Sequence, residues 1–148
     1  MTPYDLAQRY IGIAELSGEK NHPLVQWWLS LCGFSLETPD STPWCSAFVN
    51  GMAWELRLGR SKSAAARSWL SVGTPVDLKD ARPGYDVVIL ERGTGVQPGP
   101  STTHAPGHVG FYAGVADGMV HVLGGNQGDQ VSVAAFAVTR VLGIRRLA

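Results

Sequence analysis

The sequence lacks an excess of charge of either sign, long apolar runs and clustered cysteines. Lysine plus arginine and aspartate plus glutamate both number 12, so the formal net charge is zero. The basic surface of a typical nucleic-acid-binding protein is therefore not expected. No apolar run approaches the roughly 20 residues of a membrane-spanning helix, so we expect no membrane insertion. The two cysteines, Cys32 and Cys45, form no CxxC pair and have no histidine cluster beside them, which argues against a structural zinc site.

The N-terminal residues also lack the features of a secretory signal. The first ten residues are polar, with neither a basic start nor an apolar core. We therefore expect the protein to be made in the cytoplasm and to need another route, such as a holin, to reach an extracellular target. A small basic cluster near the C-terminus is interpreted as a solvated strand face. Its members are Arg140, Arg145 and Arg146.

The apolar pattern divides the chain into a helical first half and a β-rich second half. Helical spacing and end signals predict helices at residues 2–18, 22–33, 44–59 and 64–70. Apolar or alternating runs predict strands at residues 87–90, 109–113, 119–123, 131–133 and 140–146. Helices followed by strands indicate an α+β domain, with N-terminal helices packed on a C-terminal antiparallel sheet. The length fits one domain spanning residues 1–148.

Cys45 lies where a proline-containing loop meets the predicted third helix. The unpaired N–H groups and the dipole of a helix N-terminus favour an anion, and they lower the pKa of a thiol placed there. The same N–H groups can hold the oxyanion that develops on an attacked carbonyl. Cys45 is therefore a candidate nucleophile. On this segment alone, a buried structural cysteine remains the alternative.

A cysteine nucleophile needs a base, usually histidine, and the chain has four histidines. His22 precedes a proline at a helix start and fits a structural role. His104 lies in a long loop rich in glycine and proline, and His121 alternates within a predicted strand. His108 lies at the mouth of a predicted strand with glycines on either side, so the imidazole would be held firmly beside open space. We therefore expect His108 to be the base.

The segment 124–127, Gly-Gly-Asn-Gln, is expected to place an amide beside His108. If residues 117–118 form a two-residue hairpin turn, the register puts Gln127 opposite His108, whereas a one-residue bulge puts Asn126 there. Either amide can accept the imidazole N–H and fix its tautomer. A plain turn is the alternative interpretation of this segment.

Five segments carry a joint pattern: residues 43–50 (Pro-Trp-Cys-Ser-Ala-Phe-Val-Asn), 66–69 (Ala-Arg-Ser-Trp), 83–88 (Pro-Gly-Tyr-Asp-Val-Val), 107–112 (Gly-His-Val-Gly-Phe-Tyr) and 123–127 (Leu-Gly-Gly-Asn-Gln). In this order they resemble the small CHAP and NlpC-type cell-wall hydrolases, specifically the single-domain group common in phages and prophages. The resemblance implies a papain-like fold that cleaves a peptidoglycan amide bond, with Cys45 as nucleophile and His108 as base. It favours Asn126 over Gln127 as the orienting residue. Many CHAP members carry Glu or Asn at this place, and this sequence has no Glu there.

The resemblance also bears on partners and cofactors. Some CHAP enzymes have an acidic calcium loop before the cysteine, but here only Glu37 and Asp40 are near. We therefore expect no calcium and no other cofactor. Peptidoglycan is the expected partner of a monomeric enzyme. The residues expected to contact it are Trp44, Trp69, Tyr112 and Gln127.

The biological setting and the bond stay open. A phage or prophage endolysin is the first hypothesis; a delivered antibacterial toxin, a housekeeping amidase and a non-catalytic wall-binding module are the alternatives. The bond is either the amide between the muramyl lactyl group and L-Ala or one within the stem peptide or cross-bridge.

Overall fold

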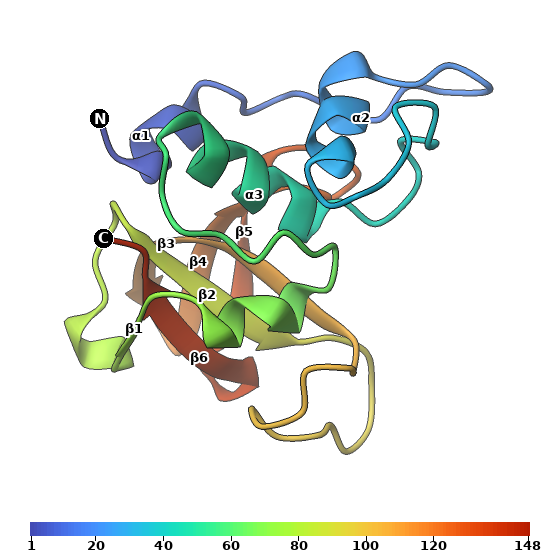
Figure 1. Ribbon diagram of the computed structural model, residues 1–148. Helices are drawn as coiled ribbons and strands as arrows, with labels where there is room; N and C mark the ends of the chain where they lie inside the picture. Colours follow the sequence, from blue (N-terminus) through green and yellow to red (C-terminus); the bar gives the residue numbers. More distant parts are fainter.

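Three helices lie on one side of a six-stranded sheet in the computed structural model, which describes residues 1–148 (Figure 1). The α-helices are α1 (Pro3–Gln8), α2 (Pro23–Ser30) and α3 (Cys45–Glu55). Short 3-10 helices follow at η1 (Ala66–Ser71), η2 (Leu78–Asp80) and η3 (Val138–Arg140). None of the helices combines the length and the apolar character that a membrane span requires.

The sheet has the strand order β1-β6-β2-β3-β4-β5, and every neighbouring pair is antiparallel. The strands are β1 (Thr74–Val76), β2 (Asp86–Glu91), β3 (Gly107–Ala116), β4 (Met119–Gly124), β5 (Ser132–Ala137) and β6 (Val141–Arg146). The predicted α+β class, with helices packed on an antiparallel sheet, is confirmed.

Apolar side chains cover both faces of the sheet. Successive residues of a strand point to opposite faces. In β2, Val87 and Ile89 accordingly join the larger core cluster, which also contains residues of all three helices. Val88 and Leu90 join a smaller cluster on the opposite face. Burial on both faces explains why β2 reads as an unbroken apolar run.

The first helix is shorter than predicted. It ends at Gln8, although apolar residues continue at helical spacing as far as Leu16. Gly12 has a φ of 99°, a conformation outside the right-handed helix, and Ala14 then forms a β-bridge with Gln130. Leu16 is exposed. Pairing with a distant segment therefore replaces the helical continuation, which local spacing cannot reveal.

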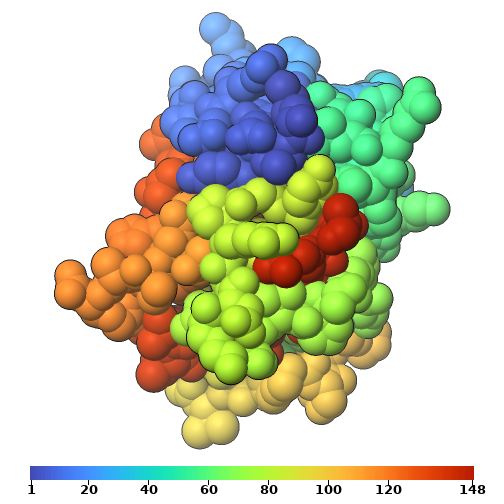
Figure 2. Space-filling model, turned by 90° about the vertical axis from the view of Figure 1, so that its left-hand side faces the viewer, coloured from blue at the N-terminus to red at the C-terminus, as the bar shows by residue number.

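The C-terminal strand lies against the middle of the chain. Figure 2 shows the C-terminal residues against the segment that contains β1 and η2. Arg146 forms an ion pair with the fully buried Asp86, with Nε–Oδ1 at 2.7 Å. Arg145 donates from Nε to the carbonyl oxygen of Leu70 at 3.0 Å. The prediction of a merely solvated basic face is therefore wrong, because these guanidinium groups hold β6 to other parts of the chain.

Arg67, in η1, anchors the long loop between β2 and β3. The residue is fully buried. Its Nη1 donates to the carbonyl oxygens of Pro98, Gly99 and Thr102 at 3.0, 2.9 and 3.1 Å, and its Nε donates to that of Pro106 at 3.0 Å. The loop that the sequence predicts as long and exposed is thus fixed from within, directly before the start of β3.

Candidate active site

Cys45 is the first residue of α3, and the residue is only 4% exposed. Trp44, at the N-cap, provides no side-chain acceptor for the free N–H groups of the first helical turn. The sulfur instead accepts hydrogen bonds from the backbone N–H groups of Ser46 and Val109. The helix start and the beginning of β3 therefore meet at the thiol.

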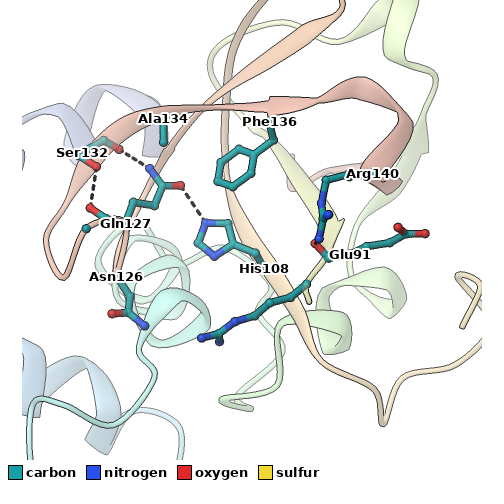
Figure 3. A pocket seen from close by; sticks show the side chains of 10 residues that line it. Glu91, His108, Asn126, Gln127, Ser132, Ala134, Phe136 and Arg140 are labelled. Atoms are coloured by element: carbon teal, nitrogen blue, oxygen red, sulfur yellow. Dashed lines mark hydrogen bonds between the residues drawn. The ribbon is translucent and has the colours of Figure 1, made fainter. Parts of the chain in front are cut away.

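His108, near the start of β3, lies between Cys45 and Gln127. Its Nε2 is 2.8 Å from Oε1 of Gln127 (Figure 3). The amide nitrogen of Gln127 donates to the carbonyl oxygens of Val122 and Ser132, at 3.1 and 2.7 Å. Because those bonds identify the other amide atom as the oxygen, Nε2 carries the proton of the His108–Gln127 bond. Nδ1 is the nitrogen that remains for the hydrogen bond with Cys45.

The contact between Cys45 and His108 favours charge on both side chains. Burial by itself raises the pKa of Cys45, but the hydrogen bond and charge of His108, helped by the two backbone N–H groups, bring that pKa below its usual value. Burial likewise lowers the pKa of His108, and its bonds with Cys45 and Gln127 more than offset this and raise it. Both shifts favour the thiolate–imidazolium form of the pair. Cys32 contrasts with it, because burial raises the pKa of that thiol to about 11.

Gln127, and not Asn126, makes the hydrogen bond to His108, so the expectation for Asn126 is wrong. The register of β3 and β4 does shift by one residue within the hairpin, which by strand geometry favours Asn126. However, β4 ends at Gly124, and Asn126 has a φ of 57° in the turn that follows. Strand alternation therefore no longer applies, and the buried side chain of Gln127 returns to the sheet. Asn126 lines the cavity beside His108.

The other histidines lie away from this arrangement. Nδ1 of His22 accepts a hydrogen bond from the backbone N–H of Leu24 at 3.1 Å and caps α2, as its position before a proline predicts. His104 is exposed in the long loop, and His121, in β4, pairs with Gly114 of β3. No three His, Cys, Asp or Glu side chains converge in a way that could hold a metal ion.

Comparison with known proteins agrees with this architecture. A solved structure of NlpC1 from Trichomonas vaginalis superposes with a TM-score of 0.54 and 19% sequence identity, over 98% of this chain and 42% of that one. The chain thus spans less than half the length of the Trichomonas protein. The fold is NlpC-like and papain-like. Neither a protein-family model nor a curated protein matches the sequence.

Three aromatic residues expected to contact substrate are instead part of the interior of this NlpC-like fold. Trp44 and Trp69 are fully buried, and Tyr112 is 6% exposed. Trp44 stacks on Trp28 with ring centroids 5.9 Å apart. Nε1 of Trp69 donates to Oγ of Ser46, the neighbour of Cys45, at 2.9 Å. The substrate-contact prediction for these three residues is therefore wrong. They support the helix and the sheet that carry the site.

A cavity of about 510 Å³ opens beside His108. Phe136, in β5, covers the imidazole with ring centroids 5.3 Å apart. Gln127 also lines the cavity, and its role in substrate binding stays a prediction. Arg92 and Arg140 also line it, and sequence reasoning missed their part in it. No local pattern signals them, because the end of β2 and the helix η3 meet only in the folded chain.

Proposed function

We propose that the protein hydrolyses an amide bond of bacterial peptidoglycan, with Cys45 as nucleophile and His108 as general acid and base. One observation carries this proposal: the first residue of a helix is a thiol that shares a hydrogen bond with a histidine, and the amide of Gln127 holds the far nitrogen of that histidine. This is the constellation that cysteine acyl transfer requires.

The first half of the proposed reaction forms a thioester. The Cys45 thiolate attacks the carbonyl carbon of the amide, and the free N–H groups at the start of α3 stabilise the resulting oxyanion. As the carbon–nitrogen bond breaks, the His108 imidazolium gives its Nδ1 proton to the leaving amine. Gln127 keeps the imidazole in the correct tautomer throughout.

The second half releases the acyl part of the substrate. His108, now neutral, takes a proton from a water molecule, and the water oxygen attacks the thioester carbonyl. The carbon–sulfur bond breaks, the product leaves as a carboxylic acid, and the thiolate–imidazolium pair is restored. The cycle needs no redox step.

The choice of peptidoglycan is supported by the five sequence segments that resemble CHAP and NlpC-type wall hydrolases. We further propose that the protein acts as a phage or prophage endolysin, as a monomer and without a cofactor. A delivered toxin would use the same site, and no structural feature favours it over the endolysin.

Digestion of purified peptidoglycan tests the proposal. We expect the wild-type protein to release soluble fragments. In the variants Cys45→Ala and His108→Ala the rate of release should fall by several orders of magnitude, because the two residues act as one cooperating unit. Mass spectrometry of the fragments identifies the bond. Release by Cys45→Ala at the wild-type rate, or no release by the wild type, would contradict the proposal.

A further inference from the structure

Two guanidinium groups line the cavity beside His108. Arg92 is an exposed residue immediately after β2. It takes part in no ion pair, since the chain's ion pair joins Arg146 and Asp86. Its charge acts on the reacting centre: besides burial, Arg92 lowers the pKa of His108, against the raising effect of Cys45 and Gln127. A free cation therefore lies within electrostatic reach of the proposed base.

Arg140, in η3, fixes the position of Arg92. Its Nη2 donates to the carbonyl oxygens of Glu91 and Gly93, both at 3.0 Å. These are the two residues that flank Arg92, so the backbone is held on each side of it. The two bonds use only Nη2, and they leave Nη1 and Nε of Arg140 for a ligand in the cavity.

No carboxylate forms an ion pair with Arg92 or Arg140 in the cavity. Glu91 is the acidic residue among those that line it, but its carboxylate points away from His108, beyond Arg140 (Figure 3). It forms no ion pair with either arginine. Apart from His108, the remaining polar side chains that line the cavity are uncharged: Asn126, Gln127 and Ser132. The open part of the cavity is thus cationic.

The position of the cavity defines which part of a substrate it holds. His108 lines the cavity, and Cys45 does not. In the proposed reaction His108 protonates the leaving amine. A group in the cavity therefore lies on the leaving-group side of the scissile amide, and not on the acyl side that becomes attached to Cys45.

We propose that Arg92, positioned and assisted by Arg140, selects substrates that carry a free carboxylate on the leaving-group side of the scissile bond. This proposal rests on the proposed function and specifies one chemical group, a carboxylate, of the substrate that the proposed enzyme hydrolyses. Guanidinium pairs with a carboxylate through charge-assisted, often bidentate hydrogen bonds. A carboxamide at the same place presents N–H groups to the cation and cannot form this pair. Peptidoglycan stem peptides carry such carboxylates, and their amidated forms lack them.

Matched muropeptides test the proposal. The substrates are a disaccharide–tetrapeptide with free carboxylates and the same compound with carboxamides. We expect the wild-type kcat/KM to favour the acid by about 10²-fold, on the scale of a hydrogen bond to a charged group. Arg92→Gln should reduce this ratio to about 1. Arg57→Gln removes an exposed arginine that lines a different pocket, and should keep the wild-type ratio.

Binding separates the failure of this proposal from failure of the proposed function. Cys45→Ala, with and without Arg92→Gln, is titrated calorimetrically with the stem tetrapeptide in its acid and carboxamide forms. Tighter binding of the acid that depends on Arg92 would uphold the proposal even if the wild type hydrolysed neither muropeptide. Equal binding of the two peptides, or hydrolysis with equal kcat/KM for the two muropeptides, would overturn it while leaving amide hydrolysis intact.

Discussion

The amide oxygen of Gln127 lies 2.8 Å from Nε2 of His108. The same amide is fixed at its nitrogen by the carbonyl oxygens of Val122 and Ser132, and Oγ of Ser132 donates to the backbone carbonyl of Gln127 at 3.0 Å. A flip of the amide would place its nitrogen against Nε2 and its oxygen against two carbonyls. The orientation of Gln127, and with it the tautomer of His108, is therefore set by the ends of β4 and β5.

Replacement of this amide should slow the reaction without unfolding the protein. We expect Gln127→Ala to lower kcat by about 10²-fold or more, the scale seen when the orienting member of a triad is disturbed. Asn126→Gly is the matched control, because glycine accepts the positive φ of Asn126, and it should keep kcat within severalfold. Steady-state kinetics on muropeptides measures both. Equal losses of kcat in Gln127→Ala and Asn126→Gly would show that Gln127 has no special role in orienting His108.

The contrast between these two neighbours shows how far the sequence leads. Cys45 and His108 were identifiable because each has a local signal: a proline-containing loop before a helix, and a histidine at the glycine-flanked start of a strand. The third residue depends on the path of the chain after β4, where Asn126 adopts a left-handed conformation. The register without a bulge favours Gln127 and the family resemblance favours Asn126, and only the folded backbone decides between them.

The same distinction applies to the fold. The order of helices and strands follows from hydrophobic periodicity, so the α+β class was predictable. The early end of α1, the strand β1 and the meeting of Arg92 with Arg140 were not, because each depends on a partner far away in the chain. Ala14 bridges Gln130, and β1 pairs with β6. Tertiary pairing overrides local propensity at these places.

Alkylation should distinguish the two cysteines. At neutral pH we expect iodoacetamide to modify Cys45 at least tenfold faster than Cys32, because the pKa of Cys45 is lowered and that of Cys32 is raised to about 11. Accessibility acts in the opposite direction, since Cys45 is buried and Cys32 is half-buried. Peptide mass spectrometry measures both rates. His108→Ala should slow the labelling of Cys45, and faster labelling of Cys32 in the wild type would contradict the assignment.

Activity should depend on pH through both members of the charged pair. The rate rises as pH increases through the lowered pKa of Cys45, so the acidic limb should lie below about 8.5, the ordinary thiol value. It falls as pH increases through the raised pKa of His108, so the alkaline limb should lie above about 6.5. Profiles of kcat/KM measure both limbs. Gln127→Ala should move the alkaline limb to lower pH, because Gln127 raises the pKa of His108; an unmoved limb would argue against this contact.

Arg67 should contribute to stability and to the order of the loop between β2 and β3. Arg67→Met removes four hydrogen bonds from a fully buried guanidinium. We expect a loss of about 3 kcal/mol, which lowers Tm by roughly 10 °C for a chain of this length. The exposed Arg9 offers the control, and Arg9→Met should change stability by less than about 0.5 kcal/mol. Calorimetry measures Tm, and limited proteolysis should cut the freed loop first; an uncut loop in Arg67→Met would refute the anchoring role.

A methyl group at Gly124 should separate Gln127 from His108. A Cβ at this position would lie 2.6 Å from Oε1 and 3.1 Å from Cδ of Gln127. The next contact, with Cα of Gly110 at 3.5 Å, is ordinary. The side chain of Gln127 can move, whereas the backbone of β4 is held on both sides by β3 and β5. Gly124→Ala should therefore fold and should lose most of the kcat that Gln127→Ala loses.

A double-mutant cycle tests whether these losses share one cause. If Gly124→Ala acts by displacing the amide of Gln127, the variant that combines it with Gln127→Ala should be no slower than Gln127→Ala alone, because neighbours that act through one contact are not additive. Additive losses in kcat would show that Gly124 affects the site by another route. Circular dichroism and Tm, measured on all three variants, show whether loss of folded protein contributes. With folding intact, the non-additive result would mean that the end of β4 affects the site through the hydrogen bond between Gln127 and His108.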